Sequence, residues 1–381
     1  MMRAAQPKVT LSKAALRLVF VLPVVASLIA GIAGGLVRAG VSIPAVGSWL
    51  SPAVASHAFL MICTFMGTVI GIERAVAVKH PLAFAGPLAS GIAGIAALCG
   101  AATVGTWLVA AASLAFAAVN VVVVMRQRAA HTVLLLVAAL AWATGSLFHA
   151  IGARADAVVP WWFCFLVLTI AAERLEMTRL MRRRQGASLV LYSIFGAMLI
   201  GAALSAFPSA WGGVLYGLSL LTLSVWLMAF DIARRTVRAQ GLSRYMAVCL
   251  LLGYFWLFVA GAAWTATSLG LPFRDAALHA LALGFVFSMM LGHAPVILPA
   301  IARVKVLFGW AYCVPLALLH GSLAVRLVAG RFDFQALASG ALGNALAIAA
   351  FIATVVGSAI AWRLKYSLPL SKQNHGVAVE H

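Results

Sequence analysis

Charged side chains are scarce in this chain of 381 residues: only 9% are Asp, Glu, Lys or Arg, and just 8 are acidic. Soluble domains contain about 25% charged and about 45–50% apolar residues, whereas 64% of this chain is apolar. A soluble globule could not bury so many apolar side chains, and a disordered chain needs the opposite composition. The composition therefore excludes both classes and leaves the lipid bilayer as the solvent.

Several motifs of soluble enzymes are also missing. The sequence contains no P-loop, no GxSxG, no HExxH and no dinucleotide-binding fingerprint. The 5 cysteines lie inside apolar runs and none forms a CxxC pair, which argues against a disulfide framework. The segments between apolar runs are too short for a soluble catalytic domain. Any chemistry must therefore use the membrane-embedded part of the chain.

Apolar runs long enough to cross a bilayer of about 30 Å follow one another along the whole chain. Strands of a barrel would alternate polar and apolar residues, and no such alternation is present, so the runs predict helices. We predict an all-α polytopic membrane protein with about twelve transmembrane helices over residues 16–362, between cytoplasmic segments 1–15 and 363–381. The runs are Leu16–Val37, Val54–Val78, Leu88–Thr103, Trp107–Met125, Thr132–Ile151, Val158–Leu180, Ser188–Phe207, Trp211–Phe230, Tyr245–Leu269, Ala277–Ile301, Val306–Val325 and Ala336–Trp362.

The basic residues indicate the orientation of the spans. Lys and Arg total 27 and the formal net charge is +19, but these residues cluster between apolar runs, so we attribute the charge to topology and expect no nucleic-acid partner. All but five of them lie on the side of the two termini. That side is cytoplasmic by the positive-inside rule, and the five on the outer side are Arg38, Arg154, Arg274, Arg326 and Arg331.

The second and tenth spans resemble one another. The segment from His57 to Gly71 aligns without a gap beside the segment from His279 to His293, and both begin with His-Ala. The sixth span lacks the histidine, but it closes with Glu173-Arg174 where the second closes with Glu73-Arg74. This pattern predicts three pseudo-repeated units of four helices.

Five of the nine histidines fall inside predicted spans, where ionisable groups are costly and usually mark a ligand, a cofactor or a proton path. The orientation places His57, His149, His279 and His320 in the outer half of the membrane. On a regular α-helix His293 would lie about 21 Å deeper than His279 and about 40° around the helix from it. The alternative for any one histidine is a hydrogen bond between helices.

Histidines at one depth on different helices suit a metal. Two imidazoles can hold a haem iron from opposite sides, and neutral imidazoles also bind copper. Met61 follows His57 by one helical turn and should share its face. Gly145, one turn before His149, and Gly284 and Gly292 on span ten would leave space for a flat cofactor.

The segment His279-Ala-Leu-Ala-Leu-Gly284, followed by Met289 and Gly292, resembles a helix of the NnrS family, and His57 with Met61 resembles an early helix of that family. The resemblance implies a haem and/or copper protein linked to nitric oxide metabolism and nitrosative stress. It also implies nitric oxide as a small gaseous ligand and the bacterial inner membrane as the location.

A wider similarity is to subunit I of haem-copper oxidases, which also has twelve helices in three pseudo-repeats. It implies His57 and His279 as axial ligands. In a protein of this kind we expect His149 and His320 to complete or flank a metal site, and His293 to form a second, deeper site or a polar link. Span ten has no His-x-His pair and span six no histidine, so the copper centre of an oxidase cannot be mapped. We therefore do not expect a proton-pumping oxygen reductase. Whether the protein catalyses another reaction stays open.

Two other functions remain open from the sequence. One is a transporter or channel without a prosthetic group, whose histidines line a path. The other is an assembly or scaffold protein whose histidines only bond helices together. Apart from the lipid bilayer and the gaseous ligand, the sequence implies no partner, and it leaves the oligomeric state open.

The acidic residues give little support to a carboxylate-driven transporter. Glu73, Glu173 and Glu176 lie near cytoplasmic helix ends beside arginines, and we expect ion pairs that join these ends, with Glu176 and Arg179 facing one another at i, i+3. We expect no carboxylate within the membrane near the outer histidines.

Overall fold

The computed structural model describes residues 13–44, 47–178, 185–302 and 304–367. These residues form helices and contain no strand. Twelve helical stretches among them, some made of several consecutive helical elements, are long and apolar enough to cross a membrane. The chain is therefore an all-α polytopic membrane protein, as its composition predicts. Most of the predicted segment 1–15 and of the tail 363–381 lies outside the described residues.

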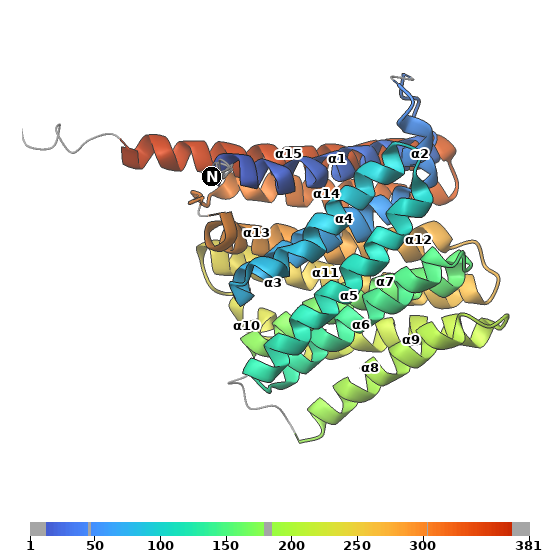
Figure 1. Cartoon of the computed structure of the whole chain (residues 1–381). Helices are drawn as coiled ribbons and strands as arrows, with labels where there is room; N and C mark the ends of the chain where they lie inside the picture. The colour runs from blue at the N-terminus through green and yellow to red at the C-terminus, as the bar shows by residue number, and fades with distance from the viewer. Residues whose placement is uncertain (1–12, 45–46, 179–184, 303, 368–381) are drawn as a thin grey trace, which may run out of the picture. The chain divides into compact units, whose positions relative to one another are not determined.

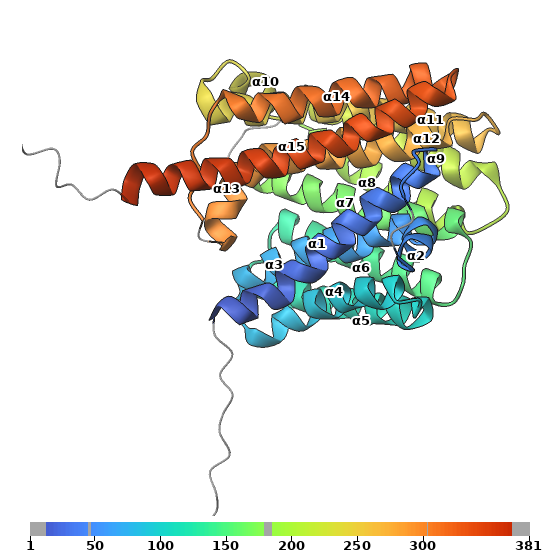
Figure 2. The ribbon, with the colours of Figure 1, turned by 90° about the horizontal axis from the view of Figure 1, so that it is seen from above.

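The chain divides into two compact units, one made of Met1–Arg179 with Leu199–Gly212 and the other of Leu180–Met198 with Gly213–His381. The first unit contains six spans, and its neighbouring helices α4 and α5 run side by side (Figures 1 and 2). Its elements are α1 (Lys13–Arg38), α2 (Leu50–Ala55), η1 (Phe59–Met66), α3 (Gly67–Val78), η2 (Pro81–Phe84), α4 (Ala85–Leu98), α5 (Ala102–Arg126), α6 (Ala130–Ala150) and α7 (Ala155–Met177).

The second unit holds the remaining spans, and the division between the units falls within α8 (Ala187–Leu204). Its last two long helices, α14 and α15, lie side by side in both views (Figures 1 and 2). Its other elements are α9 (Ala210–Phe230), α10 (Ala233–Thr236), α11 (Gly241–Ser268), α12 (Arg274–His279), η3 (Ala280–Phe287), α13 (Ser288–Ala302), η4 (Trp310–Tyr312), α14 (Cys313–Leu327), η5 (Ala329–Arg331) and α15 (Phe334–Ser367).

The boundary between the third and fourth spans differs from the prediction. We expected the break near Gly105, but α4 ends at Leu98 and α5 starts at Ala102. The turn uses Gly100, whose φ of +84° is a left-handed conformation that glycine adopts without strain. Gly105 instead lies inside α5, where a Cβ atom would come within 2.9 Å of the Ala93 carbonyl oxygen. It is a packing glycine that lets α5 approach α4.

Small residues set the close approach of helices within each unit. In the first unit, a Cβ atom on Gly67 would come within 2.5 Å of the Trp142 ring. In the second unit, a Cβ atom on Gly261 would come within 2.5 Å of the Leu221 backbone nitrogen. Such contacts are typical of membrane helices, whose association depends on close packing because lipid is as apolar as their surfaces.

The second and tenth spans share a departure from regular helix. Each contains eight residues of π-helix, η1 and η3, which start two residues after His57 and directly after His279. The sixth span, α7, is α-helical throughout. Since π-helical segments are rare and often lie at functional sites, this likeness supports the relation between spans two and ten. The three four-helix repeats stay a prediction.

An ion pair joins the second and sixth spans at one end of the first unit. The Arg74 Nη2 atom lies 3.3 Å from Oε1 of Glu173 and 3.6 Å from Oε1 of Glu73. The expected link between helix ends is thus confirmed for Arg74 and Glu173. The predicted pair of Glu176 with Arg179 cannot be described, because Arg179 lies outside the described residues.

Candidate functional site

His57 lies in the short connection between α2 and η1, and its ring packs against α1. Its Nδ1 atom is 2.7 Å from the Gly31 carbonyl oxygen, and a Cβ atom on Gly35 would come within 2.6 Å of its Cε1 atom. Gly31 meets Met61 in the same way, with Sδ at 2.6 Å from the position of a Cβ atom. His57 and Met61 therefore share the face toward α1, as their spacing predicted, and glycines make room for both.

The hydrogen bond of His57 fixes the form of its ring. A carbonyl oxygen only accepts, so Nδ1 must carry the proton and the lone pair of the neutral imidazole is on Nε2. Histidines that bind metals donate their other ring N–H to a carbonyl or carboxylate in this way. The surroundings of His57 thus suit a ligand to a haem iron or a copper ion through Nε2.

His149, near the end of α6, lies among aromatic rings of the same unit. Its ring centroid is 5.0 Å from that of Trp162, edge to face, and 5.5 Å from that of Phe59. One turn earlier, a Cβ atom on Gly145 would come within 2.8 Å of Trp162. Gly145 therefore admits the indole of Trp162 rather than leaving open space beside His149, and the predicted metal role of His149 stays a prediction.

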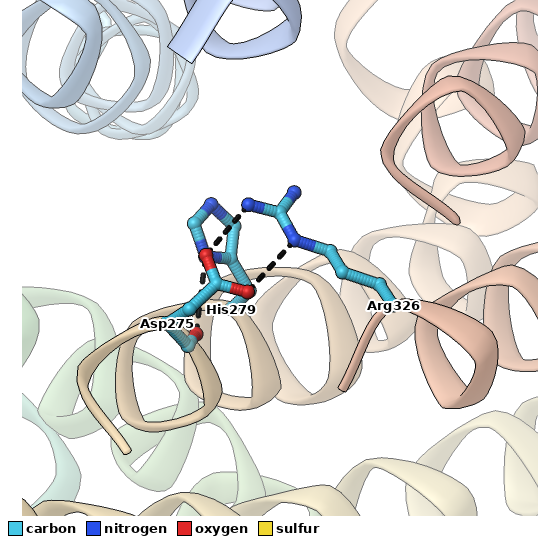
Figure 3. A network of polar contacts seen from close by, with 3 residues as sticks. All are labelled: Asp275, His279 and Arg326. Carbon is cyan, nitrogen blue, oxygen red and sulfur yellow. Dashed lines mark hydrogen bonds and ion pairs between the residues drawn. The ribbon is translucent and has the colours of Figure 1, made fainter. Parts of the chain in front are cut away.

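His279 closes α12 and belongs to a polar network with Asp275 and Arg326, drawn in Figure 3. Its Nδ1 atom is 2.9 Å from Oδ1 of Asp275, one turn earlier, and 3.1 Å from the Asp275 carbonyl oxygen. The Arg326 guanidinium on α14 donates two hydrogen bonds to the same carboxylate, from Nε at 3.0 Å and Nη2 at 2.7 Å. Both neighbours of Nδ1 are acceptors, so in the neutral form of the ring the lone pair is on Nε2, as for His57.

His293 lies in α13 and is half-buried. Its Nδ1 atom is 2.7 Å from the Met289 carbonyl oxygen, one turn earlier in the same helix. The predicted angle of about 40° from His279 assumed a regular α-helix, and it no longer applies because η3 separates the two residues. His293 has the same ring form as His57 and His279.

Both ring nitrogens of His320 on α14 have partners on other helices of the same unit, and its Nδ1 is an acceptor where Nδ1 of His57 is a donor. The Trp256 indole N–H donates to Nδ1 at 2.8 Å, and Nε2 lies 3.3 Å from the Ser288 hydroxyl oxygen. The Ser288 hydroxyl in turn donates to the Cys249 carbonyl oxygen at 2.7 Å. This network joins α11, α13 and α14 and accounts for a polar side chain within the membrane without a metal.

Replacing Trp256 by phenylalanine is expected to destabilise the protein, because it removes the N–H donor from Nδ1 of His320. An acceptor left without its partner in a buried site costs about 1–3 kcal/mol. The measurement is thermal unfolding in detergent. Trp310→Phe is the matched control, since the Trp310 side chain is 80% exposed. Equal stability of the two variants would contradict the structural role of this network.

The five histidines divide between the units, His57 and His149 in the first and His279, His293 and His320 in the second. The pairing of His57 with His279 therefore stays a prediction. Within the described ranges, no group of three or more His, Cys, Asp or Glu side chains could hold a metal ion. A haem with two histidine ligands does not need such a group.

Sequence reasoning missed the partners of His279. We expected no carboxylate within the membrane near the outer histidines, and we did not foresee that Asp275, in the first turn of α12, lies 2.9 Å from the His279 ring. The spacing of four residues on one helix was a signal that could have found the pair. In the sequence, Arg326 was used only as one of the basic residues that indicate the orientation of the spans. Nothing in the sequence predicted that α14 lies beside α12.

Residues 17–360 match the model of a protein family described as a domain of unknown function, DUF8744. No curated protein and no solved structure matches the chain.

Proposed function

The chain belongs to the DUF8744 family, and we propose that it is a membrane-embedded haem and/or copper protein of NnrS-like type. In this proposal His57 and His279 supply imidazole ligands through Nε2, and the protein acts in nitric oxide metabolism or in tolerance of nitrosative or respiratory stress. The location that goes with it is the bacterial inner membrane. A bound haem or copper would supply one-electron redox chemistry and a metal able to bind a small gas.

The observation that carries the proposal is the hydrogen bonding of Nδ1 in His279. A carboxylate held by an arginine accepts this N–H, and such carboxylate–histidine pairs orient metal-bound imidazoles and raise their basicity. His57 supports the proposal independently, since its Nδ1 faces a carbonyl oxygen and its ring is held against glycines.

A transporter or channel without a prosthetic group is the second candidate. It is favoured by Asp275, His279 and Arg326, three ionisable residues joined by ion pairs within membrane-spanning segments. Such residues often mark ion or proton paths. In this candidate the histidines would line the path. Its expectation is substrate or proton movement in vesicles by a protein that contains neither haem nor copper.

The test is a visible spectrum of the detergent-purified full chain, first oxidised and then reduced with dithionite, with iron and copper assayed on the same sample. The cells must be able to supply haem and copper. We expect absorption bands of a haem or a copper site that change on reduction, and a further change on adding nitric oxide. A colourless protein without either metal would overturn the proposal and favour the transporter.

A further inference from the structure

The pair of Asp275 and Arg326 is more elaborate than an exposed ion pair. The Arg326 side chain is only 9% exposed, and its two N–H donors meet the two oxygens of one carboxylate. This fork arrangement fixes geometry more strictly than a single contact does. The same Asp275 Oδ1 that accepts from Nη2 lies 2.9 Å from the His279 Nδ1 atom. The arginine therefore acts on the histidine through the carboxylate.

The position of Arg326 is itself fixed by α15. A Cβ atom on Gly340 would come within 2.5 Å of the Arg326 backbone nitrogen, so the two helix backbones are in direct contact there. One turn further on, the buried Asn344 donates from Nδ2 to the Ser322 hydroxyl at 2.7 Å and to the Leu319 carbonyl oxygen at 3.2 Å. These contacts hold α14 so that the guanidinium reaches Asp275.

We propose that Asp275 and Arg326 are positioning residues that set how strongly His279 donates electrons to a metal bound at Nε2, with opposite effects. The Asp275 carboxylate draws on the Nδ1 proton and strengthens the imidazole as a ligand. The Arg326 cation offsets this charge and limits the effect. This inference rests on the proposed function, because it requires a metal at His279.

The corresponding contact of His57 is with an uncharged acceptor. Its Nδ1 atom faces the Gly31 carbonyl oxygen at 2.7 Å, where Nδ1 of His279 has both a carbonyl oxygen and a carboxylate. A carboxylate is the stronger acceptor. The acceptors at Nδ1 of the two imidazoles therefore differ in charge.

The experiment measures the reduction potential of the cofactor by spectroscopic titration in Asp275→Asn and Arg326→Gln. Loss of the carboxylate charge destabilises the oxidised metal, so we expect Asp275→Asn to raise the potential. Its cofactor affinity should fall by about 10–100-fold, the usual cost of losing an outer-shell partner. Arg326→Gln removes the offsetting cation, and we expect it to lower the potential. The double variant should lie between the two.

Two controls separate this effect from a change of net charge. Asp333→Asn removes a carboxylate that caps the start of α15, where Oδ1 accepts from the Gln335 N–H at 3.0 Å. Arg331→Gln removes a guanidinium that lies 4.9 Å from the centre of the Phe273 ring. Both controls should leave the potential as in the wild type. If a single variant fails to fold, the potential of the double variant can still be measured, because the double variant leaves no unpaired charge in this network.

Potentials of Asp275→Asn and Arg326→Gln equal to those of the controls, in proteins that retain the cofactor, would overturn the positioning role and leave the proposed function intact. Shifts of the same sign in both variants would also overturn it. A wild-type protein without haem or copper would overturn the proposed function itself, and the positioning role with it.

Discussion

Replacing His279 by alanine is expected to abolish the bound cofactor while the helices remain folded. The change removes the imidazole that we propose as a ligand but leaves the bidentate pair of Asp275 and Arg326 in place. Loss of an outer-shell partner lowers the affinity for the metal by about 10–100-fold. Loss of a ligand itself should lower the affinity for the cofactor by more than this. The measurement is haem and copper content per polypeptide, with thermal unfolding of the same samples.

His80→Ala is the matched control for this prediction. His80 is exposed before η2, where its Nδ1 atom accepts from the Leu82 N–H at 3.3 Å. The control should keep the full cofactor content. A His279→Ala protein that also keeps it would show that His279 is not a ligand.

Replacing Gly35 by alanine is expected to displace the His57 ring. The added Cβ atom would come within 2.6 Å of Cε1 and 3.0 Å of Nδ1 of His57, so either the ring or α1 must move. Overpacking of this kind costs about 1–3 kcal/mol, and the displaced ring loses its hydrogen bond to Gly31. We expect a lower thermal stability together with a loss of cofactor.

Gly196→Ala tests whether this effect belongs to the site. Gly196 lies within α8, and a Cβ atom there would have no atom within 4 Å. Because alanine favours a helix over glycine by about 0.5–1 kcal/mol, this control should be as stable as the wild type or more so, with unchanged cofactor. If Gly35→Ala is also as stable as the wild type and keeps its cofactor, the position of the His57 ring does not depend on the space that Gly35 leaves.

The fold class and the spans followed directly from composition, because twelve apolar runs separated by charged or turn-forming residues have few alternatives in a bilayer. The boundary at Gly100 could not be predicted, since Gly100 and Gly105 are both plausible breakers and only packing against α4 distinguishes them. The π-helical segments η1 and η3 were also hidden, because their residues are as apolar as those of an ordinary span.

The candidate site was predicted only in part. The sequence singled out His57 and His279 because paired histidines in apolar runs are unusual, but it gave no information on their ring forms. Those forms depend on Gly31, 26 residues away from His57, and on the carboxylate of Asp275. Arg326 lies 51 residues from Asp275, so their pairing depends on tertiary packing that no local pattern encodes.

His57 and His279 are the proposed ligands of a haem or a copper ion. The most direct test is the haem and copper content of the purified wild-type chain beside that of the double variant His57→Ala/His279→Ala, from cells supplied with iron, haem precursors and copper. We predict a stoichiometric cofactor in the wild type and none in a double variant that still unfolds cooperatively. A wild type without cofactor, or a double variant that retains it, would contradict the assignment of His57 and His279 as ligands.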